Sequence, residues 1–154
     1  KLEREGEDIT IVATSVMVLE AKRAAKHLED SGISAEIINL HSISHPDKEM
    51  ILKSVKKTGR LLVVDTSWPE YGVCSEINRI INEHNPKILK SPTKSLGMVS
   101  TPCPTAKALE DMYYPDVHDI VKTSACLVIG DENDVKLPKK ESMTDFYKHF
   151  KGPF

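Results

Sequence analysis

Three runs of apolar, mostly β-branched residues alternate along the chain with segments whose apolar positions have a helical spacing. The runs cover residues 8–14, 33–40 and 60–65. Strands that are apolar on both faces are typical of a parallel sheet buried between two layers of helices. The intervening segments are long enough to form the right-handed crossovers that join parallel strands. The pattern therefore predicts a three-layer α/β fold.

Each intervening segment carries its own helix signals. Gly32 and Gly59 are placed to end the first two helices, and Asp47 is placed to cap the second. The apolar positions of each segment recur every three or four residues, as expected for one buried helical face. The three predicted faces are Ala21, Ala24, Ala25 and Leu28; Met50, Ile51, Ser54 and Val55; and Val73, Ile77, Ile80, Ile81 and His84.

The pattern weakens after Pro86. Residues 93–99 suggest a fourth strand, and Leu109 suggests a short helix that ends before Pro115. Asp116 is a good cap for a last helix. Residues 126–129 fit either the end of that helix or an edge strand.

From Gly130 onward the chain becomes polar, and its last residues are rich in aromatics. We therefore divide it into a domain of residues 1–129 and an extension of residues 130–154. Aromatic side chains bury a large area each, so this tail is expected to pack on its own domain or on a partner. The aromatic residues of the tail are Phe146, Tyr147, Phe150 and Phe154.

The composition excludes several classes of protein. With 40% hydrophobic residues, 29% charged residues and a net charge of −2, the chain resembles an ordinary globular domain without a basic surface for nucleic acid. No apolar run approaches the about 20 residues of a membrane span, and the first residues lack the apolar centre of a secretory signal. We therefore expect a cytoplasmic protein that binds neither membrane nor nucleic acid. Its three cysteines lack paired spacing and should be reduced.

The chain begins with Lys1, which suggests a processed product or a domain of a longer protein.

Polar residues follow the predicted strands at their carboxyl ends, and this is the edge at which a parallel sheet binds ligands. Ser15 or Ser67 with His41 could suggest a small hydrolase, but the chain has no Gly-x-Ser-x-Gly turn to expose a nucleophile. The loop after the first strand contains no glycine, so it cannot cradle a diphosphate. The six histidines are isolated and form no cluster with metal-ligand spacing. We predict no catalytic, cofactor-binding or metal-binding residue in this chain.

Four stretches in order resemble the C-terminal domain of the transketolase superfamily. They are EREGEDITIVATS, GISAEIINLHSISHPD, ILKSVKKTGRLLVVDTSWPEYGVCSEI and STPCPTAKALED. The similarity extends over about residues 2–121. It is strongest to the β subunits of thiamine-diphosphate-dependent 2-oxoacid dehydrogenases, such as the pyruvate and branched-chain enzymes. A transketolase-like enzyme is the other parent protein that the resemblance allows.

The resemblance implies a mostly parallel five-stranded sheet with one antiparallel strand. It also implies that the whole enzyme decarboxylates a 2-oxoacid oxidatively, using thiamine diphosphate and magnesium bound between two other domains and not by this one. The domain would then assemble a homo-oligomer or a heterotetramer with an α subunit, and help to dock the acyltransferase core. The alternative is a stand-alone binding or regulatory module derived from the same domain.

The sequence departs from the family pattern near the predicted carboxyl edge of the sheet. Where the family usually has two arginines, this chain has His41 and His45, which titrate near neutrality. The loop after the third strand lies at or near a subunit contact in the family, and its large aromatics would be natural anchors. The candidate interface or crevice residues are His41, His45, Asp65, Thr66, Trp68, Tyr71, Gly72 and Glu76.

Overall fold

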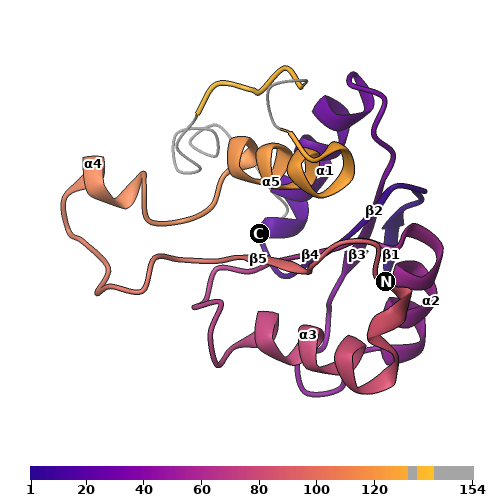
Figure 1. The fold of residues 1–154 in the computed structure, drawn as a ribbon. Coiled ribbons are helices and arrows are strands. Elements are labelled where there is room, and N and C mark those ends of the chain that lie inside the picture. The colour runs from indigo at the N-terminus through magenta and orange to yellow at the C-terminus, as the bar shows by residue number, and fades with distance from the viewer. Residues whose placement is uncertain (132–134, 141–154) are drawn as a thin grey trace.

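The computed structural model describes residues 1–131 and 135–140 of the chain. Its described part forms a five-stranded sheet in the order β1-β3-β2-β4-β5 (Figure 1). β1 pairs antiparallel with β3, and the other neighbours pair in parallel. This confirms the predicted sheet. The strands are β1 (Leu2–Arg4), β2 (Ile9–Ala13), β3 (Ala35–Asn39), β4 (Leu61–Val64) and β5 (Lys94–Leu96).

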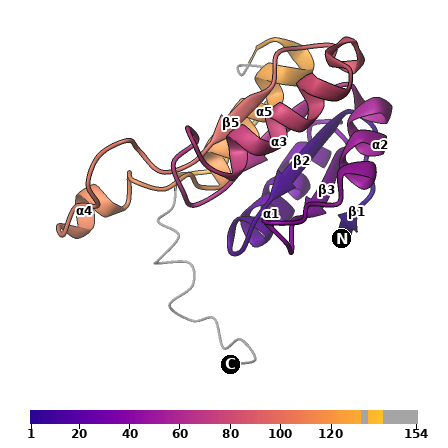
Figure 2. The same ribbon diagram turned by 90° about the horizontal axis from the view of Figure 1, so that it is seen from below.

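Helices cover both faces of the sheet, as the apolar runs predict. α1 (Met17–Glu29) and α5 (Val117–Ile129) lie on one face, and α2 (Lys48–Thr58) and α3 (Val73–His84) lie on the other (Figure 1). Figure 2 shows the molecule from the side of α2 and α3. The central strand β2 contributes side chains to the hydrophobic cores on both faces of the sheet, because successive side chains of a strand point to opposite faces. Ile11 packs into the core beneath α1 and α5, whereas Val12 packs into the core beneath α2 and α3.

The predicted helix boundaries follow from local chemistry. The Asp47 carboxylate accepts a hydrogen bond from the backbone N–H of Met50 at 3.0 Å, and Gly59 ends α2 with a φ of +77°. Asp116 and Asp119 form a reciprocal capping box at the start of α5. The helix continues to Ile129, so residues 126–129 are not an edge strand.

The apolar face predicted for α3 is wrong at one position and incomplete at another. His84 is exposed at the last turn, where the helix leaves the sheet. Cys74 is fully buried instead, with its Sγ 3.9 Å from the carbonyl oxygens of Val63 and Leu96. A thiol fits this close contact with the sheet, where a larger side chain would collide with the strands.

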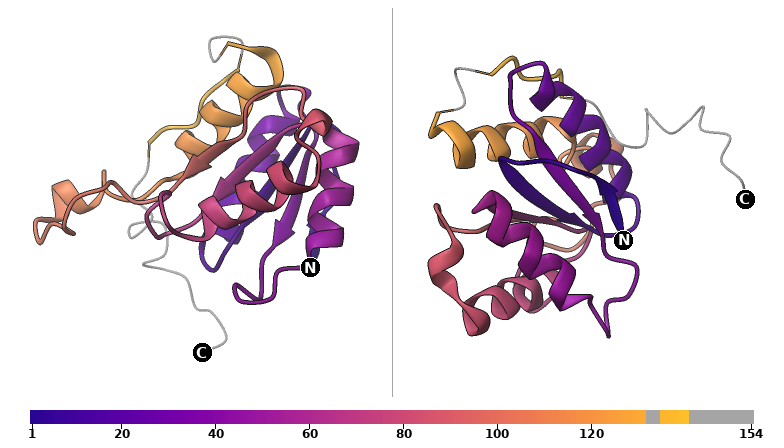
Figure 3. Two further views of the ribbon diagram at one scale, coloured as in Figure 1. Left: turned by 60° about the horizontal axis from the view of Figure 1, so that its bottom comes forward. Right: turned by 90° about the vertical axis from the view of Figure 1, so that its right-hand side faces the viewer.

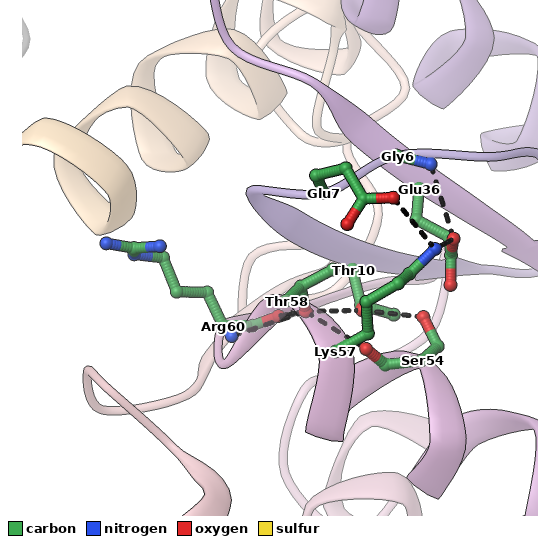
Figure 4. Close-up of polar contacts among 8 residues, drawn as sticks. All are labelled: Gly6, Glu7, Thr10, Glu36, Ser54, Lys57, Thr58 and Arg60. Carbon is green, nitrogen blue, oxygen red and sulfur yellow. Dashed lines mark hydrogen bonds and ion pairs between the residues drawn. The ribbon is translucent and has the colours of Figure 1, made fainter.

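A cluster of buried, hydrogen-bonded hydroxyls connects α2 to the central strand of the sheet (Figure 4). The Thr10 hydroxyl hydrogen-bonds to the Ser54 hydroxyl at 2.7 Å and to the Thr58 hydroxyl at 2.8 Å. All three residues are buried. The polar positions inside these otherwise apolar elements therefore satisfy one another.

We expect Thr10→Val to lower the free energy of unfolding by about 1–3 kcal/mol, because it leaves two buried hydroxyls without this partner. Chemical denaturation measures the change. Thr10→Ser, which keeps the hydroxyl, should cost clearly less. Equal losses in the two variants would show that the hydroxyl has no special role.

Arg60 fastens α5 to the opposite face of the sheet. Its guanidinium donates from Nε to the carbonyl of Leu127 at 2.9 Å, and from Nη1 to the carbonyl of Asp8 at 3.1 Å. The last carbonyls of a helix lack partners within the helix. Arg60 therefore satisfies the end of α5 and connects it to the loop before β2.

An arm, residues 97–112, leaves the sheet after β5 and projects from the body of the molecule (Figures 1 and 3). It contains α4 (Lys107–Glu110). At its base the backbone N–H of Val99 donates to the carbonyl of Tyr113 at 3.1 Å, and the Tyr113 hydroxyl donates to the carbonyl of Thr101 at 2.8 Å. Hydrogen bonds to Tyr113 therefore hold the base of the arm.

The helices of the described residues are all too short or too polar to cross a bilayer. The aromatic tail and most of the predicted extension lie outside the described residues. Val135, within the extension, packs into the core beside α1 and α5.

Candidate functional site

The carboxyl ends of β2, β3 and β4 border one hollow of about 590 Å³. It lies where parallel sheets bind ligands, as the sequence predicts. We call its polar part around the buried Thr14 and Asp65, with Ser67, the floor, and its apolar part, Leu40, Ile43 and Val73, the wall. The lining residues are Thr14, Ser15, Asn39, Leu40, His41, Ile43, Asp65, Thr66, Ser67 and Val73.

Asp65 is the central charged group of this hollow. Its side chain is only 6% exposed. One carboxylate oxygen accepts the hydroxyl of Thr14, and the other accepts the hydroxyl of Ser67. Burial acts to raise the pKa of Asp65, but these two hydroxyls and the backbone N–H groups of Thr66 and Ser67 outweigh it. The pKa therefore lies below its ordinary value, and the carboxylate is ionised at neutral pH.

This lowered pKa predicts a specific loss of stability in acid. Because the folded state holds the charged form more strongly than the unfolded state, Asp65 contributes stability above its ordinary pKa of 3.8. The contribution disappears as the pH falls below that value, through the lower pKa of the folded state. In Asp65→Asn, the free energy of unfolding should fall less steeply across this acidic range. Denaturant titrations at a series of pH values measure it.

Asp30→Asn is the matched control, since Asp30 is exposed at the end of α1. It should keep the acid dependence of the original chain. An unchanged acid dependence in Asp65→Asn would refute this role for the carboxylate.

These residues do not have the geometry of a hydrolase active site. The hydroxyl of Ser67 donates to Asp65, and His41 is exposed. In the described part of the chain no hydrogen bond joins His41 to Ser15 or Ser67. A nucleophile needs such contact with its base, so the arrangement gives no activated serine.

The hollow also does not fit thiamine diphosphate. A diphosphate needs cationic partners, yet the lining contains one carboxylate and neither lysine nor arginine. Among the described residues, no group of three or more His, Cys, Asp or Glu is placed to hold a metal ion. That the cofactor binds in other domains of a whole enzyme remains a prediction.

The loop that follows Asp65 presents two aromatic side chains to solvent. Trp68 is 49% exposed and Tyr71 is fully exposed. Tyr71 also has a φ of +60°, which is unfavourable for a residue with a side chain. Gly72 begins α3, and a Cβ there would lie 2.7 Å from the carbonyl oxygen of Trp68. Glu76, one turn into α3, pairs with Arg79 at 2.7 Å.

The arm joins this loop and extends its surface. The backbone N–H of Met98 donates to the carbonyl of Ser67 at 3.1 Å, and the Ser100 hydroxyl donates to Glu70 at 3.3 Å. We call residues 66–72 with the arm the loop–arm surface. The sequence did not reveal the apolar part that the arm contributes. Its exposed apolar side chains are Val99, Leu109 and Met112.

The structure therefore divides the predicted site residues into three sets. His41, Asp65 and Thr66 line the hollow. Trp68, Tyr71, Gly72 and Glu76 belong to the adjoining loop and the start of α3. His45 lies apart on the loop before α2, where its Nδ1 is 3.0 Å from the Ser44 hydroxyl.

Known proteins match most of this chain. The family described as "Transketolase, C-terminal domain" matches residues 1–120. The pyruvate dehydrogenase E1 component subunit beta-1 of Arabidopsis thaliana is 44% identical over 80% of this chain and 34% of its own length. The subunit beta of Saccharomyces cerevisiae is 42% identical over 79% of this chain and 34% of its own length. The chain thus spans about a third of these relatives.

A solved structure has the same fold. It is described as "Split gene transketolase, inactive beta4 tetramer" and superposes with a TM-score of 0.73 at 27% identity. The match covers 84% of this chain and 40% of that one. The resemblance seen in the four sequence stretches is therefore confirmed.

One expectation is wrong. The composition and the three cysteines suggested a cytoplasmic protein, but the Arabidopsis and yeast relatives are both named as mitochondrial. Reduced cysteines and a modest net charge do not distinguish the cytosol from the mitochondrial interior, so composition could not have decided the compartment.

Proposed function

Because this chain belongs to the transketolase C-terminal domain family, we propose that it is the assembly domain of a mitochondrial, thiamine-diphosphate-dependent 2-oxoacid dehydrogenase β subunit of the pyruvate dehydrogenase type. The whole enzyme would oxidatively decarboxylate a 2-oxoacid, with thiamine diphosphate and magnesium held by its other domains. Residues 1–129 would form the assembly domain, and residues 130–154 its C-terminal extension.

The exposed loop–arm surface is the observation that carries this proposal. Large apolar side chains exposed together are typical of interaction sites. The left-handed backbone of Tyr71 costs free energy, and the described residues leave its ring exposed. A partner subunit packed against the surface would offset both costs. The projecting arm would then reach over that partner, either a second β subunit or an α subunit.

A chimera tests the function. The matching C-terminal part of the S. cerevisiae β subunit is replaced by this chain and expressed with its α subunit. Sedimentation velocity reports assembly, and pyruvate decarboxylation reports activity. We expect assembly and retained activity. A folded chimera that stays unassembled would contradict the proposal, as would micromolar binding of thiamine diphosphate to this chain alone.

The same experiment distinguishes this function from the alternative, a stand-alone binding or regulatory module. A stand-alone module would neither replace the yeast domain nor assemble with the α subunit.

A further inference from the structure

The hollow occupies the point where the chain changes direction in the sheet. β2 lies between β3 and β4, so the chain moves from β2 to one side and then crosses to the other. The helices that follow β2 and β4, α1 and α3, cover opposite faces of the sheet (Figure 1). Open α/β sheets take up ligands at such a point, outside the carboxyl ends of their strands.

The floor of the hollow presents hydrogen-bond acceptors and one negative charge. The hydroxyls of Thr14 and Ser67 both give their protons to Asp65. Their oxygens can then only accept further hydrogen bonds. The carboxylate stays ionised because the hydroxyl and backbone donors hold it. His41 is the one lining residue able to carry a positive charge, and it lies exposed at the rim.

The remaining wall is apolar. Leu40, Ile43 and Val73 line it, and Ile43 is largely exposed. A volume of about 590 Å³ lies within the range of small-molecule sites. The hollow thus combines an acceptor-rich, anionic floor with an apolar wall, which together fit a ligand that carries donors and a positive charge at one end and hydrocarbon at the other.

We propose that this hollow binds a small alkylammonium ion. The ammonium group lies over the floor, where its N–H donors meet the oxygens of Thr14, Ser67 and Asp65. The alkyl part lies against Leu40, Ile43 and Val73. The proposal goes beyond the proposed function and does not depend on it, since it rests on the chemistry of this hollow alone.

Three probes of one shape test the charge requirement. They are isopentylamine, its carboxylate counterpart isovalerate, and the neutral 3-methylbutan-1-ol. Each is titrated into the isotopically labelled 154-residue chain at neutral pH, and amide chemical shifts are followed. We expect isopentylamine to bind at about millimolar strength and to shift the amides of Ser15, Thr66 and Ser67. Isovalerate should not bind, and the alcohol should bind more weakly than the amine.

Substitutions at Ile43 test the location without touching the buried floor. Both substitutions remove the apolar contact of Ile43, so they are compared with each other. Ile43→Lys places a positive charge at the exposed rim and should bind the amine about tenfold more weakly than Ile43→Glu, which places a negative charge there. Asp65→Asn should also abolish the preference for the amine over the alcohol, and Asp30→Asn should leave it unchanged. If Asp65→Asn fails to fold, the comparison of Ile43→Lys with Ile43→Glu still shows whether the amine binds in this hollow.

The proposal is overturned if the amine fails to bind, or if isovalerate binds as well as the amine. Amine binding that is equal in Ile43→Lys and Ile43→Glu would overturn it too, because the charge at the rim would then be irrelevant.

Discussion

A variant with both Trp68 and Tyr71 replaced by alanine is expected to fold normally but to associate with its partner subunit at least about 100-fold more weakly. Both rings are already exposed in this chain, so their removal opens no cavity in its core. If they are anchors in the assembled enzyme, their loss removes the two largest exposed side chains of the loop–arm surface. Sedimentation of the yeast chimera over a range of concentrations measures the weakening.

The control for this experiment is Ile129→Ala, which removes a comparably exposed apolar side chain at the end of α5. Its association should equal that of the unmodified chimera, and the melting temperatures of both variants should stay close to the original. If the double variant assembles as tightly as the control, the loop–arm surface is not the contact.

Gly97→Ala is expected to detach the arm from the loop and to lower the free energy of unfolding by about 1–3 kcal/mol. An added Cβ would overlap the carbonyl oxygen of Ser67 and press on the ring of Pro69. The backbone would have to separate there, which breaks the hydrogen bond from Met98 to Ser67. Denaturation measures the stability, and sedimentation of the chimera shows whether assembly is lost with it.

The matched control is Gly32→Ala. Gly32 has a φ of +77°, but a Cβ there would meet no atom within 4 Å. Its cost should therefore be conformational only, about 1 kcal/mol, with assembly intact. Equal assembly of the Gly97→Ala and Gly32→Ala variants would argue against a fixed junction between loop and arm.

The sequence predicted the elements whose signals are local. Buried strands such as β2 and β4 are short apolar runs, and Asp47, Gly59 and Asp116 mark helix ends by chemistry confined to one turn. β1 has no such signal. It is three residues long and partly exposed, and it is held by pairing with β3, which lies more than thirty residues away. Only the family resemblance implied an antiparallel strand.

The candidate site could be predicted only as far as local sequence signals define it. Polar residues after successive strands place His41, Asp65 and Thr66 at one edge of the sheet, and the structure gathers them there. The sequence could not reveal that Thr14 and Ser67 both donate to Asp65, because this depends on β2 lying beside β4. Nor could it reveal the arm, since apolar residues such as Val99 and Met112 usually pack against their own domain.

Amide hydrogen exchange, followed by mass spectrometry, on this chain alone and within the assembled chimera shows whether the domain joins subunits. We expect assembly to slow exchange chiefly in residues 66–72 and 97–112, the loop–arm surface. Adding thiamine diphosphate to the chain alone should change nothing. Protection confined to other surfaces on assembly, or slowed exchange around the hollow when the cofactor meets the isolated chain, would contradict a domain that joins subunits without holding the coenzyme.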